Sequence, residues 1–179
     1  QNCIGVQRIY VQEALFDRFA ETFAEVTKKY RIGDKMDEKT DMGPMIEEKE
    51  AVRVEQWIRE AVDGGAKVLA GGKRKGTLVE PTVLVNTPRG SKLDCQEVFG
   101  PVVSLFPVKD LDEGIRRSNE MNFGLHAAVF TPDLQKAFRA IHETYQASLN
   151  TYATLYNGVC QRDWFHARAR GYRTTLDAA

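Results

Sequence analysis

Residues 102–121 read VVSLFPVKDLDEGIRRSNEM. The first seven of them, Val102–Val108, form a strongly apolar run that is typical of a strand. Residues 111–121 follow after a short break and predict a helix. A strand that leads into a helix is the repeating unit of layered α/β folds. The stretch therefore predicts an α/β domain.

The same alternation extends to both sides of this stretch. Residues 6–12 alternate apolar and polar side chains, which predicts a strand, and residues 13–30 have the apolar spacing of an amphipathic helix. We expect further helices at 47–63 and 133–145 and further strands at 67–70, 78–85, 125–130 and 147–149. Pro81 divides the strand at 78–85 into two pieces or confines it to a sheet edge. The whole pattern predicts one α/β domain with a largely parallel sheet flanked by helices.

The composition argues against nucleic acid and membranes as partners. The chain has 179 residues, enough for one sizeable core, and 25 basic side chains balance 25 acidic ones. A net charge of zero gives no long-range field that would attract nucleic acid or an anionic membrane. No run approaches the roughly 18 apolar residues of a membrane-spanning helix. We therefore expect no nucleic-acid or membrane partner and a cytoplasmic location.

Metal sites and disulfides are not expected either. Three cysteines, Cys3, Cys95 and Cys160, are an odd number without metal-site spacing. The acidic residues of the loop at 32–44 lack the spacing of an EF-hand, so a solvated loop is the simpler interpretation.

Cys3 is the sharpest chemical candidate. It lies in a short segment just before the first expected strand, and a thiolate can add to a carbonyl carbon as a strong nucleophile. The alternative for a lone cysteine is a small, buried packing residue.

Glu97 and Phe99 form the second candidate. An ionised carboxylate can accept hydrogen bonds from two vicinal hydroxyls, and an aromatic ring can supply an apolar wall for another ring. The alternative is a loop with a solvated Glu97 and a core Phe99, and on the residues alone it is the preferred one. The three histidines, His126, His142 and His166, are scattered and none is predicted as a base.

Several segments together resemble the aldehyde dehydrogenase family. Residues 1–3, Gln-Asn-Cys, resemble the end of the Gly-Gln-x-Cys segment that holds the nucleophile, and residues 97–102 resemble the most recognisable segment after it. The other matching segments follow in the family's order: 33–34, 40–46, 65–67, 71–72, 81–84, 122–125, 129–131 and Asn150. The agreement in order over residues 1–150 makes the resemblance specific.

The resemblance implies a role for each candidate residue. Cys3 would attack an aldehyde to give a thiohemiacetal, and loss of hydride to NAD or NADP would leave a thioester that becomes a carboxylate. The backbone amide of Cys3 would contribute to the oxyanion hole. Glu97 would bind the ribose hydroxyls on the nicotinamide side, and Phe99 would pack near the nicotinamide.

The resemblance also implies that parts of the family's machinery lie outside the chain. The dinucleotide-binding domain, the water-activating glutamate and the asparagine of the oxyanion hole precede the nucleophile in the family. We therefore expect residues 1–150 to be part of the catalytic domain, inactive alone, and the complete enzyme to be a homo-oligomer.

Residues 151–179 depart from the family. Tyr156–Val159 loosely matches a family turn, but Leu155 replaces its proline, Cys160 replaces a lysine, and the Ser-Gly-x-Gly-Arg motif is absent. The segment is rich in arginine and alanine, which predicts an atypical tail with little order. A frameshift is the other interpretation, because codons for residues 161–165 can be chosen that read Ser-Gly-Thr-Gly one base later.

Two other functions stay open at this point. The first alternative is a truncated, non-catalytic relic that associates with partners, and the second is a cysteine-dependent esterase. The esterase needs a histidine beside Cys3, and the sequence does not position one.

Overall fold

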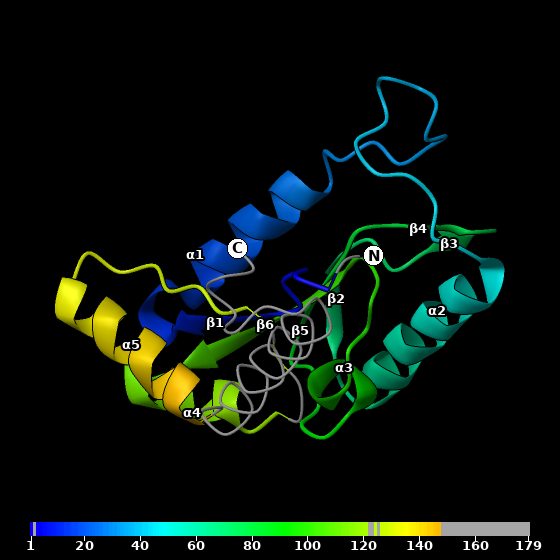
Figure 1. Cartoon of the computed structure of the whole chain (residues 1–179). Helices are drawn as coiled ribbons and strands as arrows, with labels where there is room; N and C mark the ends of the chain where they lie inside the picture. Colours follow the sequence, from blue (N-terminus) through cyan, green and yellow to red (C-terminus); the bar gives the residue numbers. More distant parts are fainter. Residues whose placement is uncertain (2, 122–123, 125, 148–179) are drawn as a thin grey trace, which may run out of the picture. The chain divides into compact units, whose positions relative to one another are not determined.

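The computed structural model describes residues 1, 3–121, 124 and 126–147 (Figure 1). The chain divides into two compact units, residues 1–127 and 128–179. The limits expected from the sequence, 1–150 and 151–179, stay predictions. The expected tail lies outside the described residues, as do residues 148–149 of the strand expected at 147–149. Residue 147 is the last residue of a helix, so that strand is wrong in its described part.

The first unit contains all the strands and four of the helices found in the described part of the chain. In order they are β1 (Arg8–Gln12), α1 (Glu13–Thr27), α2 (Glu48–Asp63), β2 (Lys67–Ala70), β3 (Arg74–Lys75), β4 (Leu78–Val79), β5 (Thr82–Val85), α3 (Lys92–Cys95), β6 (Val102–Val108) and α4 (Leu111–Asn119). The second unit contains α5 (Leu134–Ala147). None of the described helices is long and apolar enough to cross a membrane.

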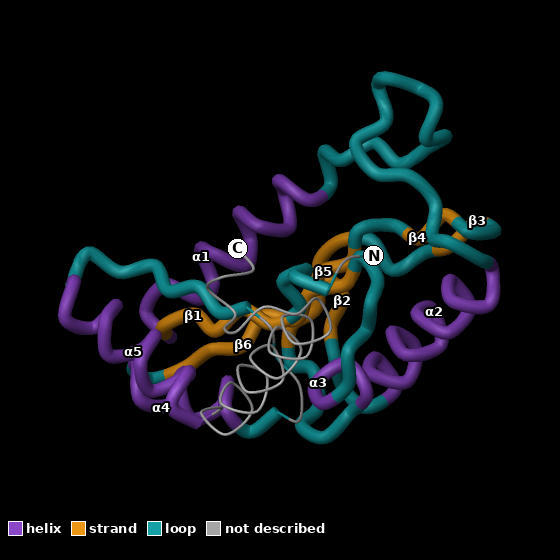
Figure 2. The backbone as a smooth tube through the Cα atoms, viewed as in Figure 1, coloured by secondary structure: helices purple, strands orange, loops and turns teal. Residues whose placement is uncertain are grey.

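The main sheet confirms the largely parallel α/β architecture. Its strand order is β1-β6-β5-β2, and β6 runs parallel to both β1 and β5. Only β2, at one edge, is antiparallel, and it pairs with β5. Strands β3 and β4 form a separate two-stranded hairpin (Figure 2). The expected strand at 78–85 is indeed two pieces, β4 and β5, on either side of Pro81.

Helices cover both faces of this sheet. On one face, Ala20 and Ala24 of α1 pack against Val83, Val85 and Leu105. On the other face, Val54 and Ile58 of α2 pack with Leu84, Val102 and Val98. Because successive side chains of a strand point to opposite faces, β5 and β6 contribute alternately to the two cores.

Several details differ from the sequence prediction. Residues 126–130 form no strand, so the strand expected at 125–130 is wrong in its described part. No strand pairs with this segment among the described residues, and Phe130 is 98% exposed. An apolar run becomes a strand only where it finds a partner and a surface to cover. The short helix α3 and the hairpin β3–β4 were not expected, because two- to four-residue elements show no periodicity.

Gly71 makes the close approach between β2 and β5 possible. Its φ is +71°, and a Cβ there would lie 2.2 Å from the carbonyl oxygen of Pro81. Gly76 also has a positive φ, +59°, but a Cβ there would meet nothing within 4 Å. An added Cβ would therefore cause backbone strain at both positions and a steric clash only at position 71.

We expect Gly71→Ala to destabilise the protein more than Gly76→Ala. The left-handed conformation costs an alanine about 1–2 kcal/mol at either site, and the contact with Pro81 adds to that cost only at position 71. Urea unfolding of the two variants measures the difference. Equal losses of unfolding free energy would show that the sheet edge moves to accommodate the methyl group.

Candidate functional site

The segment that carries Cys3 lies on the surface of the first unit. Cys3 is exposed, so its interpretation as a buried packing residue is wrong. The side-chain oxygen of Gln1 accepts a hydrogen bond from the backbone N–H of Ile46 at 2.8 Å. This contact holds the start of the chain beside the segment that leads into α2.

The loop from Glu97 to Phe99 is fixed at its central residue. Val98 is 1% exposed and belongs to the core beneath α2. Its N–H donates to the side-chain oxygen of Gln7 at 2.9 Å, and its carbonyl accepts from Nη2 of Arg53 at 2.7 Å. Glu97 and Phe99, on either side, are both exposed.

Phe99 is therefore not a core residue, and this part of the preferred alternative is wrong. Its ring is 42% exposed, and its φ of +50° lies in the left-handed region that bulky residues rarely adopt. Gly100 follows, and a Cβ there would lie 2.9 Å from Cγ2 of Val54. The tight passage at Gly100 and the turn at Phe99 together keep the ring out of the core. Backbone strain of this kind is often found at functional sites.

The Cys3 segment and the Glu97–Phe99 loop both contact the residues just before α2. Gln1 bonds to Ile46, and the preceding residue, Met45, is buried beside Gly100, where a Cβ would lie 3.5 Å from the Met45 Cε. Gln7 bonds directly to Val98. The structure thus brings the segment after Gln1 and the Glu97–Phe99 loop to one region of the first unit.

Arg53 has a fixed orientation below this loop. Its Nε donates to Glu50 at 2.8 Å, and its guanidinium lies over the ring of Trp57 at 4.5 Å from the ring centroid. A guanidinium held by a carboxylate and an aromatic face is well oriented for its hydrogen bond to the Val98 carbonyl.

Cys95 differs from Cys3 in exposure and in hydrogen bonding. It is half-buried, and its thiol donates to the carbonyl oxygens of Ser91 at 3.1 Å and Gly90 at 3.4 Å. Cys160 lies outside the described residues, as does His166. His126 is exposed, and His142 packs against Phe138 within the second unit, with ring centroids 4.0 Å apart.

The acidic loop at 32–44 forms ion pairs and turns. Asp41 accepts hydrogen bonds from the side chain and the backbone N–H of Arg31, and these bonds hold the pKa of that carboxyl below its usual range. Asp34 and Asp37 accept from backbone N–H groups two residues on. In the described part of the chain, no three His, Cys, Asp or Glu side chains are grouped to hold a metal ion.

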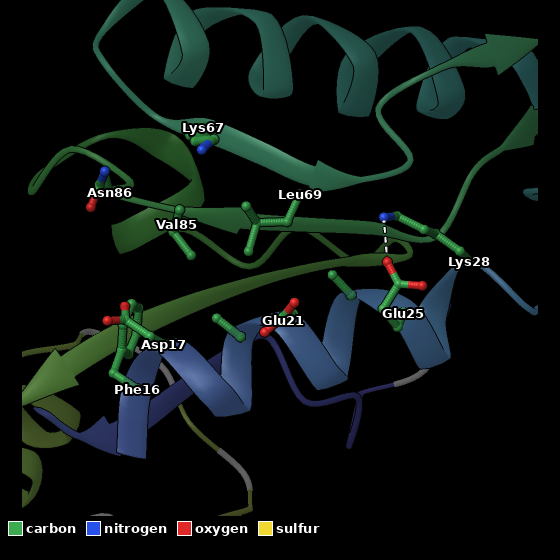
Figure 3. A pocket seen from close by; sticks show the side chains of 11 residues that line it. Phe16, Asp17, Glu21, Glu25, Lys28, Lys67, Leu69, Val85 and Asn86 are labelled. Carbon is green, nitrogen blue, oxygen red and sulfur yellow. Dashed lines mark hydrogen bonds and ion pairs between the residues drawn. The ribbon is translucent and has the colours of Figure 1, made fainter. Parts of the chain in front are cut away.

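A groove that the sequence does not predict lies between α1 and the edge of the sheet (Figure 3). It has a volume of about 430 Å³ and an apolar floor that includes Phe16, Leu69 and Val85. Charged side chains, among them Glu21 and the ion-paired Glu25 and Lys28, line it as well. None of Cys3, Glu97 and Phe99 lines the groove, so it is separate from the candidate site.

Comparison with known proteins gives a consistent result. Residues 1–159 match the aldehyde dehydrogenase family, so the match extends past Asn150 and includes Tyr156–Val159. The 3-sulfolactaldehyde dehydrogenase of Priestia aryabhattai is 48% identical over 143 residues, which is 80% of this chain and 30% of that protein. The NADP(+) succinate-semialdehyde dehydrogenase GabD of Escherichia coli is 40% identical over 142 residues, 78% of this chain and 30% of that protein.

The fold has close counterparts among solved structures. Aldehyde dehydrogenase 21 from Physcomitrella patens, in complex with the reaction product succinate, superposes with a TM-score of 0.78 at 42% identity. The superposition covers 80% of this chain and 30% of that one. The chain thus spans about 30% of the length of the relatives it matches.

Proposed function

The chain belongs to the aldehyde dehydrogenase family, and from this premise we propose that it is a catalytic-domain part of an NAD(P)-dependent enzyme that oxidises an aldehyde to a carboxylate. One observation carries the proposal. An exposed thiol, Cys3, lies on a segment that is joined to the loop presenting Glu97 and Phe99. The named relatives act on small aldehydes that carry a sulfonate or a carboxylate, so a small anionic aldehyde is the proposed substrate class.

Cys3 is the proposed nucleophile. Its thiolate adds to the aldehyde carbon, a C–S bond forms, and the carbonyl oxygen takes the electron pair of the broken π bond. The backbone N–H of Cys3 donates to that oxygen in the resulting thiohemiacetal. Loss of hydride from the same carbon leaves a thioester on Cys3, and water then releases the carboxylate and restores the thiol.

Glu97 and Phe99 are the proposed residues on the cofactor's side. A bound nicotinamide dinucleotide supplies the hydride acceptor. The exposed carboxylate of Glu97 can accept two hydrogen bonds from vicinal ribose hydroxyls, and the exposed face of Phe99 can pack against a flat ring. These residues suit only the ribose and ring end of the cofactor, since the sequence has no Gly-x-Gly-x-x-Gly to hold phosphates.

The reaction also needs a dinucleotide-binding domain, a glutamate that activates water and an asparagine of the oxyanion hole. The resemblance implies that these lie in the part of the relatives' sequences that the chain does not span. The chain alone is therefore expected not to oxidise aldehydes at a useful rate. The first unit has large exposed apolar side chains near the site, including Ile4 at 53%, Val6 at 63% and Ile46 at 82%. Such side chains support contact with further protein. A homo-oligomeric state and a cytoplasmic location of the complete enzyme stay part of the proposal.

We expect Cys3 to be alkylated several-fold faster than Cys95 at neutral pH. Cys3 is exposed, whereas the thiol of Cys95 is half-buried and donates to two carbonyl oxygens. Brief iodoacetamide treatment followed by mass-spectrometric mapping measures both rates. Succinate semialdehyde should slow the labelling of Cys3 alone, because the thiohemiacetal removes the free thiolate.

Cys95 serves as the internal control in the same sample. If Cys3 stays unlabelled while Cys95 reacts, the thiol is not available to a substrate and the proposed catalytic role is lost. If the aldehyde slows both cysteines equally, the protection is not due to a site at Cys3.

A further inference from the structure

Gln7, the residue just before the edge strand β1, has an unusual set of side-chain hydrogen bonds. Its Nε2 donates to the carbonyl oxygens of Leu93 at 3.2 Å and Gln96 at 2.7 Å, and its Oε1 accepts from the N–H of Val98 at 2.9 Å. Its backbone carbonyl accepts from the N–H of Ser104 at 2.9 Å. One residue is thus bonded to α3, to the loop after α3 and to β6.

Only a carboxamide of this length meets all three side-chain contacts. They require two N–H donors and one acceptor on a single planar group, which a glutamine supplies. A carboxylate offers acceptors alone, and a methionine of similar size offers neither a donor nor a strong acceptor. Replacement would leave the N–H of the buried Val98 without its partner.

The side-chain bonds of Gln7 lie next to the candidate site. Gln7 lies four residues after Cys3, and the groups it holds flank Glu97 on both sides. Arg8 adds a parallel bond, from Nη1 to the carbonyl oxygen of Asp94 at 2.9 Å. Arg53 holds the Val98 carbonyl from the α2 side. Gln7 therefore connects the strand that follows the nucleophile's segment to the loop by a direct side-chain hydrogen bond.

We propose that Gln7 is a positioning residue that fixes the Glu97–Phe99 loop relative to the segment of Cys3. The proposal rests on the function proposed above for these three residues. Gln7 touches neither an aldehyde nor a cofactor in this role. It acts through Val98, whose main chain it holds so that the side chains of Glu97 and Phe99 project outward.

Amide hydrogen exchange of the whole 179-residue chain tests the proposal. We expect Gln7→Met to raise the exchange rate of the Val98 amide about tenfold or more, because the amide loses its acceptor. Amides in the middle of α1, at Ala20 and Ala24, should keep their rates. The matched control is Gln56→Met, which removes an exposed glutamine on α2 whose Nε2 donates to Glu60, and it should leave Val98 unchanged.

Gln7→Glu adds a readout that a merely structural role would not give. At neutral pH the introduced carboxylate faces the carbonyl oxygens of Leu93 and Gln96, and the loop should exchange fast. As the pH falls and the carboxyl takes up a proton, it can donate one hydrogen bond again while accepting from Val98. Protection of Val98, corrected for the intrinsic pH dependence of exchange, should then recover in this variant and not in Gln7→Met.

Two results would overturn the proposal. Unchanged exchange at Val98 in Gln7→Met would show that Arg53 and the core hold the loop without Gln7. Faster exchange throughout the first unit would show that Gln7 only adds global stability. Both outcomes are measured independently of cysteine labelling. A non-reactive Cys3 would contradict the proposed function, whereas only the exchange rates decide whether Gln7 holds the loop.

Discussion

We expect the unchanged chain to release a burst of nitrophenolate from 4-nitrophenyl acetate, and we expect replacement of Cys3 by alanine to abolish it. In the unchanged chain the thiolate takes the acetyl group, nitrophenolate leaves, and a thioester forms on Cys3. We expect the rate of this acylation to fall by roughly three orders of magnitude in Cys3→Ala, as for removal of a nucleophile. Stopped-flow absorbance follows the burst, and mass spectrometry locates the acetyl group.

The shape of the burst separates the three functions considered for the chain. A single equivalent without further turnover supports the dehydrogenase part, because the glutamate that activates water in the family is outside the chain. Sustained turnover supports a cysteine-dependent esterase. No burst at all supports a non-catalytic relic. Cys95→Ala is the matched control and should retain the full burst, since the thiol of Cys95 is half-buried.

The sequence predicts the large elements because each has a period that a sheet or helix face imposes. The apolar run at Val102–Val108 is found as the central strand β6, and the apolar steps after Glu13 are found as α1. α1 ends at Thr27, three residues before the predicted end at 30, because Lys28 and Lys29 lie in a turn. Helix periodicity continues through such residues, so it does not locate the end.

The site is less predictable from the residues than from the resemblance. On the residues alone Phe99 is expected in the core, because an aromatic ring next to an apolar strand is usually buried. The structure buries Val98 instead, and the left-handed backbone at Phe99 turns the ring outward. The residue type of Phe99 gives no sign of that conformation, and Gly100 signals only that a turn is near.

The role of Gln7 cannot be predicted from the sequence, for a different reason. In the sequence it is one polar residue in an alternating strand pattern, and its side-chain partners lie 86 to 91 residues away. No local pattern predicts hydrogen bonds over such a separation. Tertiary contacts between a strand and a distant loop are visible only once the sheet has brought β1 beside β6.

Leu105→Ala should have the largest effect on stability of the changes considered for the core. Leu105 is fully buried in β6, the strand that pairs with both β1 and β5, and packs beneath α1. Truncation removes apolar contacts and leaves a cavity that a central strand cannot close, which costs about 2–5 kcal/mol. Against a typical total of about 5–15 kcal/mol, such a loss is visible as a large shift of the urea midpoint.

Leu15→Ala is the matched control, since it makes the same chemical change at a side chain that is 58% exposed on α1. It should alter the free energy of unfolding by no more than about 0.5 kcal/mol. A similar loss in both variants would mean that Leu15 is buried in solution by another copy or another part of the protein. A small loss in Leu105→Ala would contradict the packing of α1 on the sheet, because a tightly packed core has no room to compensate for three missing carbon atoms.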